Sequence, residues 1–113
     1  MNNTCVLVGR LTKDIELKGE EVKVARFTLA VNRNFKNKDG EFEADFIPCV
    51  CFGTTAERLA EYCKKGDMIG VKGLLQSYMY EKDGYKNYGL EVSVERLTFL
   101  STLKKGDENG KQD

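Results

Sequence analysis

Apolar residues recur at every second position through most of the first hundred residues, which is the period of β-strands. Residues 4–11 are apolar at odd and even positions alike, as in a strand inside a closed sheet. In the segment 22–31 the apolar positions are even at first and odd afterwards. A strand changes face only by adding a residue, so we predict a β-bulge or sharp bend near Ala25-Arg26.

A long polar stretch, residues 32–44, follows this segment and precedes a further apolar strand at residues 45–52. Asp39-Gly40 supplies a tight turn within the polar stretch. We therefore predict a protruding hairpin loop that joins the second strand to the third.

A second hairpin joins a long strand, residues 68–80, to a last strand, residues 85–100, through the turn Lys82-Asp-Gly84. The apolar positions of the last strand also shift parity, between Val94 and Leu97. Beyond it, residues 101–113 are polar and contain glycine, and we expect them to be disordered.

One segment has the period of a helix instead. Thr54, followed three residues later by Glu57, forms a capping box at its start. Lys64-Lys65-Gly66 supplies cations and a glycine to end it. The helix has one apolar face, made of Ala56, Leu59, Ala60 and Cys63.

The order is three strands, a helix and two strands, with long hairpins. This is the arrangement of a five-stranded OB-fold, a Greek-key barrel with its helix between the third and fourth strands. A five-stranded sheet without closure is the alternative, but it would expose apolar residues on both faces of residues 47–52. We assign residues 1–100 to this single domain, which suits a chain of 113 residues.

Composition restricts the partners. No apolar run is long enough to cross a bilayer, and the start of the chain lacks the layout of a signal peptide, so we expect a cytoplasmic protein that binds no membrane. The 18 basic and 18 acidic side chains balance. A nucleic-acid binder with zero net charge must gather its cations on one face.

Catalytic chemistry finds little support in the sequence. There is no histidine, no glycine-rich phosphate loop and no serine or cysteine with a base to activate it, so we expect neither an enzyme nor a cofactor. The four cysteines could form a zinc site, but they lack the paired spacing of zinc ribbons. We expect them to be reduced and packed in the core, with no metal bound.

The aromatic residues are more informative. Phe35 lies in the basic polar stretch, where a flat apolar ring beside cations suits an unpaired base and its phosphate. The alternative is that Phe35 folds back on the barrel or packs against a second subunit. Phe46 and Phe52 share one strand face, opposite a face of better core residues, and this face is left for a ligand or a subunit. For either ring alone, ordinary core packing is the alternative to base stacking. Tyr78 and Tyr80 repeat the spacing in the second hairpin, as base-stacking rings or as a cross-strand ladder.

Basic residues alternate with these rings along the chain. This arrangement favours a role in nucleic-acid binding for the basic residues over that of ordinary solvated surface charges. A few stacked rings and phosphate contacts suffice for binding a single strand of any sequence, on a continuous path formed by the Phe46 face and the two hairpins. Our candidates for phosphate contacts are Arg10, Arg33, Lys36, Lys38, Lys65 and Lys72.

Taken together, these segments resemble the bacterial and phage single-stranded DNA-binding proteins. The similarity covers nearly the whole chain to about Leu100, in the right order and spacing. It is carried by residues 2–11, 27–35, 44–53, 56–66 and 71–76 and by the hairpin that contains Tyr80.

The resemblance implies an OB-fold, assembled as a homotetramer, that coats single-stranded DNA in replication, recombination and repair near the nucleoid. It assigns base stacking to Phe35, Phe46, Phe52 and Tyr80, where relatives often have tryptophan at the first, second and fourth positions. It assigns phosphate contacts to Lys36, Lys38 and Lys65.

Two features depart from the family pattern. Relatives carry a long tail with an acidic, apolar tip that recruits other proteins, whereas this sequence stops at Asn109-Gly-Lys-Gln-Asp113. Either a tail has been removed or this is a short relative from a phage or mobile element, which puts the recruitment of protein partners through such a tip in doubt. Pro48 also stands where relatives often have a polar or basic residue.

A second hypothesis is an OB-fold interaction module similar to the dimeric primosomal restart protein, acting mainly through protein contacts. The short tail favours it, and the full set of ring positions opposes it. A tetramer and a dimer therefore both stay open at this point.

Overall fold

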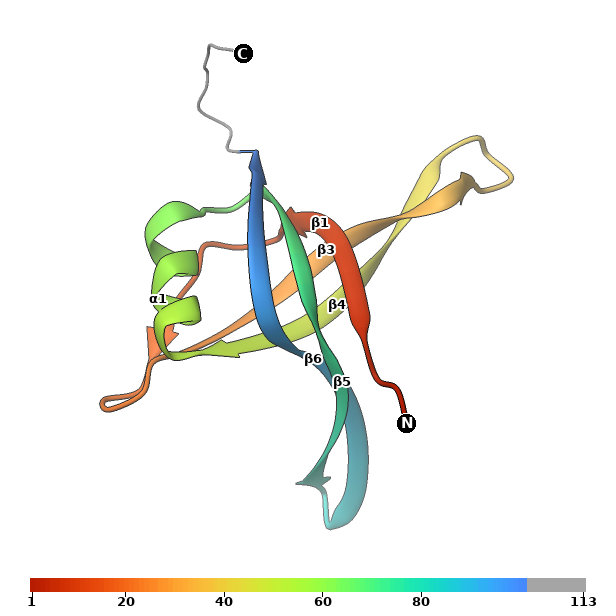
Figure 1. Ribbon diagram of the computed structural model, residues 1–113. Helices are drawn as coiled ribbons and strands as arrows, with labels where there is room; N and C mark the ends of the chain where they lie inside the picture. The colour runs from red at the N-terminus through yellow and green to blue at the C-terminus, as the bar shows by residue number, and fades with distance from the viewer. Residues whose placement is uncertain (102–113) are drawn as a thin grey trace.

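Six β-strands and one α-helix make up the part of the chain that the computed structural model describes, residues 1–101 (Figure 1). The predicted disordered tail, apart from Ser101 at the end of the last strand, lies outside these residues. In chain order the elements are β1 (Cys5–Leu11), β2 (Leu17–Lys18), β3 (Val24–Lys36), β4 (Phe42–Phe52), α1 (Gly53–Tyr62), β5 (Met68–Lys82) and β6 (Tyr85–Ser101).

The five long strands close into a barrel. They follow the order β1-β5-β6-β4-β3, and β1 pairs with β3 as well as β5 to complete the circuit. β4 and β6 run parallel, and every other pair in residues 1–101 is antiparallel. The predicted OB-fold is confirmed, with α1 between the third and fourth long strands and the two-residue β2 added beside β3.

Closure of the barrel depends on Gly9. Just beyond it, Arg10 pairs with Met68 of β5 on one edge of β1 and with Ala30 of β3 on the other, so β1 joins the two strands. A Cβ atom on Gly9 would lie 2.4 Å from the backbone oxygen of Ala30, closer than two such atoms can approach. Glycine is therefore required for the close approach of β1 to β3.

The core fills the barrel and continues under α1, whose Ala56 and Leu59 are fully buried (Figure 1). Cys49, Cys51 and Cys63 are buried in the same cluster, which confirms that they pack as core residues. Burial raises the pKa of the Cys49 thiol to about 12. No group of three metal-ligating side chains gathers within residues 1–101.

The predicted bulge near Ala25-Arg26 is wrong. β3 and β4 pair without interruption from Val24 to Asn32, and their register shifts only after Asn32. Val22 precedes β3 and is exposed, and Val24, the first residue of β3, is only half-buried, on the face opposite Ala25 and Phe27. The even apolar positions therefore do not belong to the core face of the strand. The shift predicted in the last strand is real: Glu95 is an extra residue, since its neighbours pair with the adjacent residues Gly73 and Lys72.

The capping predicted for the helix is also wrong. α1 begins at Gly53, whose φ of 64° turns the chain sharply out of β4, and Phe52 takes the N-cap position without a side-chain hydrogen bond. Thr54 therefore lies inside the first turn. At the other end the helix stops at Tyr62, and the Lys64-Lys65-Gly66 segment forms the turn that follows.

The strand β1 is buried on one face only, whereas the sequence predicted burial on both. Its odd residues face the core, but Val6 and Val8 are 70% and 51% exposed, so only one of its two apolar faces is buried in the single chain. Within residues 1–101, no helix combines the length and apolar composition that crossing a membrane requires.

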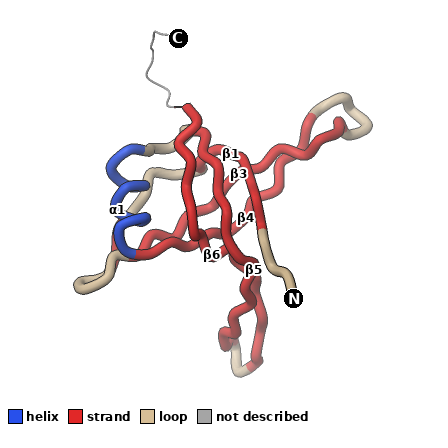
Figure 2. Tube along the Cα trace, viewed as in Figure 1, coloured by secondary structure: helices blue, strands red, loops and turns tan. Residues whose placement is uncertain are grey.

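Two hairpins project from the barrel in different directions (Figure 2). The β3–β4 hairpin contains the polar stretch predicted to protrude, and the β5–β6 hairpin is the second. Loops occupy only their tips, because the strands themselves extend far beyond the barrel (Figure 2). The hairpins thus carry their side chains mostly on paired strands rather than on loops.

Candidate nucleic-acid interface

The outer face of β4 exposes two phenylalanine rings. Phe46 is 65% exposed and Phe52 is 49% exposed, while Cys49 and Cys51 on the opposite face are buried in the core. This is the division of faces that the sequence predicted. Two exposed rings on a strand of a folded barrel, away from its core, form a surface suited to a flat apolar partner.

An ion pair crosses this face between its two rings. Arg26 of β3 and Glu91 of β6 meet at 2.7 Å, and β4 lies between their two strands in the sheet. Val50 is opposite Arg26 in the register and is only 1% exposed, although it is on the outer face. We attribute its burial to the Arg26–Glu91 pair, which spans β4 at this position.

The β3–β4 hairpin carries Phe35 and an additional ring, Phe42. Phe35 is 66% exposed and Phe42 is 55% exposed. Lys36 is opposite Phe42 in the register, and its Nζ lies 5.6 Å from the centroid of the Phe42 ring. The sequence analysis missed Phe42 because it placed residues 32–44 in a loop, whereas β4 already begins at Phe42. The available signal was a second ring in the same polar stretch as Phe35.

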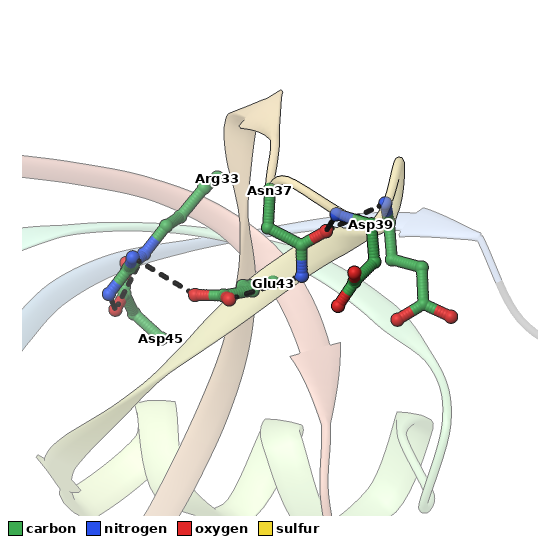
Figure 3. Close-up of polar contacts among 6 residues, drawn as sticks. Arg33, Asn37, Asp39, Glu43 and Asp45 are labelled. Carbon is green, nitrogen blue, oxygen red and sulfur yellow. Dashed lines mark hydrogen bonds and ion pairs between the residues drawn. The ribbon is translucent and has the colours of Figure 1, made fainter.

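Arg33, one of the predicted phosphate contacts, is held by carboxylates of the same hairpin (Figure 3). Its Nη2 lies 2.9 Å from Asp45 and its Nη1 lies 3.2 Å from Glu43. The hydrogen bond from Arg33 lowers the pKa of Asp45 below its ordinary value. The charge of Arg33 is therefore largely matched within the protein.

Asn37 organises the tip of this hairpin (Figure 3). Its Oδ1 accepts the backbone N–H groups of Asp39 and Glu41 at 2.9 and 3.0 Å, and its amide nitrogen donates to Glu43 at 3.2 Å. Such a side-chain turn closes the loop locally. The predicted Asp39-Gly40 turn lies inside it, with a φ of 77° at Gly40.

The β5–β6 hairpin carries Tyr78 and Tyr80 on one face, with ring centroids 6.0 Å apart. Both rings are nearly half exposed. Tyr78 is opposite Gly89, where a Cβ atom would lie 2.5 Å from Cζ of the Tyr78 ring. The ring therefore lies flat over the glycine of the neighbouring strand.

The predicted turn of this hairpin is present as well. Asp83 and Gly84 form a two-residue loop with φ values of 55° and 81°. Positive φ at both central residues is the requirement of the turn type that matches the twist of a hairpin.

A groove of about 420 Å³ connects the β4 face with the β5–β6 hairpin. Pro48 of β4 and Tyr78 of β5 line it, together with Arg26 and Glu91. Residues of the β1–β2 connection line it too. The structure thus joins the Phe46 face to one hairpin by a groove and to the other by the continuous strand β4.

The remaining predicted cations are distributed differently. Lys38 is exposed at the tip of the β3–β4 hairpin, and Lys65 is exposed in the turn after α1. Arg10 donates from Nη1 to the backbone oxygen of Gly66 at 2.9 Å. Lys72 lines a separate apolar groove on the outer side of β1, β5 and β6 and is not brought together with the Phe46 face.

Comparison with known proteins agrees with this architecture. A family model described as "Single-strand binding protein family" matches residues 2–100. The chain belongs to this family. Single-stranded DNA-binding protein 1 of Streptococcus pyogenes serotype M18 is 50% identical over 103 residues, covering 88% of this chain and 79% of that protein.

Two further single-strand binding proteins match this chain with different identities and coverages. The single-stranded DNA-binding protein of Bacillus cereus is 50% identical over 111 residues, which cover 96% of this chain but 65% of the relative's length. A solved chain of a Plasmodium falciparum SSB complex with ssDNA has a TM-score of 0.78 at 22% identity. That similarity covers 89% of this chain and 96% of the solved one, and it shows the shared fold.

Proposed function

We propose that this chain binds single-stranded DNA without sequence preference, and that it does so as a non-catalytic coat in replication, recombination and repair. The observation that carries the proposal is the pair of exposed rings, Phe46 and Phe52, on the outer face of β4 in a member of the single-strand binding protein family. A ring face stacks on any base, which accounts for binding without sequence preference.

The binding path follows from the arrangement of the rings. Bases stack on Phe46 and Phe52 and, through the groove at Pro48, on Tyr78 and Tyr80. At the other end the path continues to Phe35 on the β3–β4 hairpin. Phosphates are contacted by the cations beside these rings, and each neutralised phosphate releases counterions.

Duplex DNA does not fit this mechanism. Its bases are stacked on one another, so the protein rings have no base face to contact. Binding of the duplex would depend on phosphates alone, and the chain has no net positive charge to support it. Discrimination between single strand and duplex is therefore a direct consequence of stacking.

Self-association belongs to this proposal. Val6 and Val8 border an apolar groove of about 230 Å³ that also includes Leu100. Association of chains through this face would cover it and would give the homotetramer, or the dimer, expected from the sequence. We place the assembly in the cytoplasm, at the nucleoid, where single-stranded DNA forms.

The experiment measures binding of labelled oligo-dT and of the matching duplex at two salt concentrations. The wild-type chain binds the single strand tightly and more weakly as salt rises, while the duplex stays unbound. A Phe46→Ala, Tyr80→Ala variant loses about 1–3 kcal/mol for each lost stack. Equal binding of both DNAs, or none, would exclude the proposal and favour the interaction module, whose dimer a mass measurement would reveal.

A further inference from the structure

Phe42 and Lys36 form a continuation of the β4 face beyond Phe46. Phe42 and Phe46 are even residues of one uninterrupted strand, so their side chains point to the same side. They are four positions apart, which corresponds to about 13 Å along the strand. Between them lies Ala44, on the same side of the strand and with a small side chain.

The opposite strand completes this surface. Asn32 pairs with Ala44 and Lys36 pairs with Phe42 across the hairpin. The Lys36 ammonium lies 5.6 Å from the centroid of the Phe42 ring, within the range of a cation–π contact. The ring is still 55% exposed with Lys36 in place, so part of its surface is available to a further partner.

Acidic side chains of the hairpin are kept away from this surface. Glu43 and Asp45 are odd residues of β4 and point to the opposite side from Phe42. Arg33 and Asn37 hold them there, as Figure 3 shows. On the side with the rings, Lys36 therefore has no carboxylate of Glu43 or Asp45 beside it. Its positive charge is available to attract a phosphate.

From this geometry we infer that Phe42 and Lys36 form an additional nucleotide subsite, in which the Phe42 ring stacks on a base and Lys36 contacts the adjoining phosphate. The inference rests on the proposed function, and it extends the binding path of the β4 face onto the hairpin. A cross-strand pair that only stabilises the hairpin would have the same ring–cation contact but would not respond to DNA.

Tryptophan reporters distinguish these two roles. The chain contains no tryptophan, so a Phe42→Trp variant has a single indole. Its fluorescence is quenched when oligo-dT is added, because the indole stacks on a base. A Tyr62→Trp variant is the control, since Tyr62 is exposed on α1 and contacts Phe99 instead of the hairpin.

Affinity measurements supply the second readout. Phe42→Leu keeps an apolar side chain but removes the ring, and it binds oligo-dT about tenfold more weakly. Lys36→Gln reduces the slope of log affinity against log salt by about 0.7, the value for one phosphate of a single strand, whereas Lys36→Arg restores it. Thermal unfolding of each variant shows whether its hairpin and barrel are intact.

The outcomes separate this inference from the proposed function. If Phe42→Trp is not quenched and Phe42→Leu binds like the wild type while Phe46→Ala binds weakly, the subsite is excluded and the coating function stands. If the wild-type chain itself fails to bind oligo-dT, both fall together. Quenching with loss of affinity in Phe42→Leu establishes the subsite.

Discussion

The side-chain amide of Asn3 pairs with the backbone of Leu75 as a strand residue would. Its Nδ2 donates to the Leu75 oxygen at 2.8 Å, and its Oδ1 accepts the Leu75 N–H at 3.0 Å. The backbone pairing of β1 with β5 ends at Cys5 and Gly73, each two residues away from Asn3 and Leu75 respectively. Asn3 therefore extends this ladder to the point where the β5–β6 hairpin leaves the barrel.

Removing this pair should loosen the base of the hairpin. Asn3→Ala deletes both hydrogen bonds, and because the site is exposed to water we expect a loss of about 1 kcal/mol or less in the free energy of unfolding. Urea denaturation measures the loss, and amide exchange at Leu75 should accelerate. Asn2→Ala, one residue earlier, is the control; unchanged exchange at Leu75 in Asn3→Ala would contradict the prediction.

The flat position of Tyr78 depends on Gly89. In Gly89→Ala the new methyl group would overlap the ring, which must swing away because it is the flexible end of a side chain. We expect weaker binding of oligo-dT, by about threefold to tenfold, as part of one stacking contact is lost. Tyr78→Ala with and without Gly89→Ala tests the cause, since the glycine substitution should have no further effect once the ring is absent.

Glu91 should limit the affinity for DNA through Arg26. The Glu91 carboxylate pairs with the Arg26 guanidinium in the groove that Tyr78 also lines. Glu91→Gln removes the negative charge, so the guanidinium becomes available to a phosphate. We expect tighter binding at low salt and a salt dependence steeper by about 0.7, as for one additional phosphate. Glu57→Gln, at an exposed site on α1, is the matched control. Weaker binding by Glu91→Gln would show that the ion pair instead shapes the groove.

The Arg33–Asp45 pair gives the β3–β4 hairpin a defined pH dependence. The pKa of Asp45 is lowered in the folded protein by the hydrogen bond from Arg33. The pair therefore stabilises the hairpin above the ordinary pKa of 3.8, and this stabilisation is lost as the pH falls through the lower, folded pKa. An NMR titration of the Asp45 carboxyl should have its midpoint below 3.8.

Substitution of the cation tests this assignment. Arg33→Ala should raise the midpoint of Asp45 back toward 3.8, because both the hydrogen bond and the opposite charge are removed. Lys38→Ala removes a cation of the same hairpin and should leave the midpoint of Asp45 in place. A midpoint that does not move in Arg33→Ala would mean that another group lowers the pKa.

The exposed ring face of β4 was largely predictable, whereas its polar surroundings were not. The two-residue period places Phe46 and Phe52 opposite the cysteines of β4, and this division needs no knowledge of neighbouring strands. The partners of Arg33 depend on the register of β3 with β4. That register shifts after Asn32, so the spacing of charges along the chain could not reveal the contact with Asp45.

Strand boundaries show the same limit. A change of parity correctly located the extra residue Glu95 in β6, because residues on both sides of it belong to one strand. The same reasoning failed at Ala25-Arg26, because Val22 lies outside β3 and Val24, at its first position, is only half-buried on the outer face. Periodicity does not show where a strand begins.

By itself the sequence determined the succession of the five long strands along the chain, the place of the helix, the two hairpins and the apolar rings of β4. Each of these follows from local periodicity and turn residues. Only the tertiary structure decided how Arg26 reaches Glu91 across β4, how Lys36 meets Phe42, and why Gly9 and Gly89 are glycines. These relationships join segments that are distant in the chain or shifted in register. The Arg26–Glu91 pair and Gly9 depend on the closure of the barrel. The Lys36–Phe42 and Tyr78–Gly89 contacts depend on the register of the two hairpins, and no local pattern encodes either.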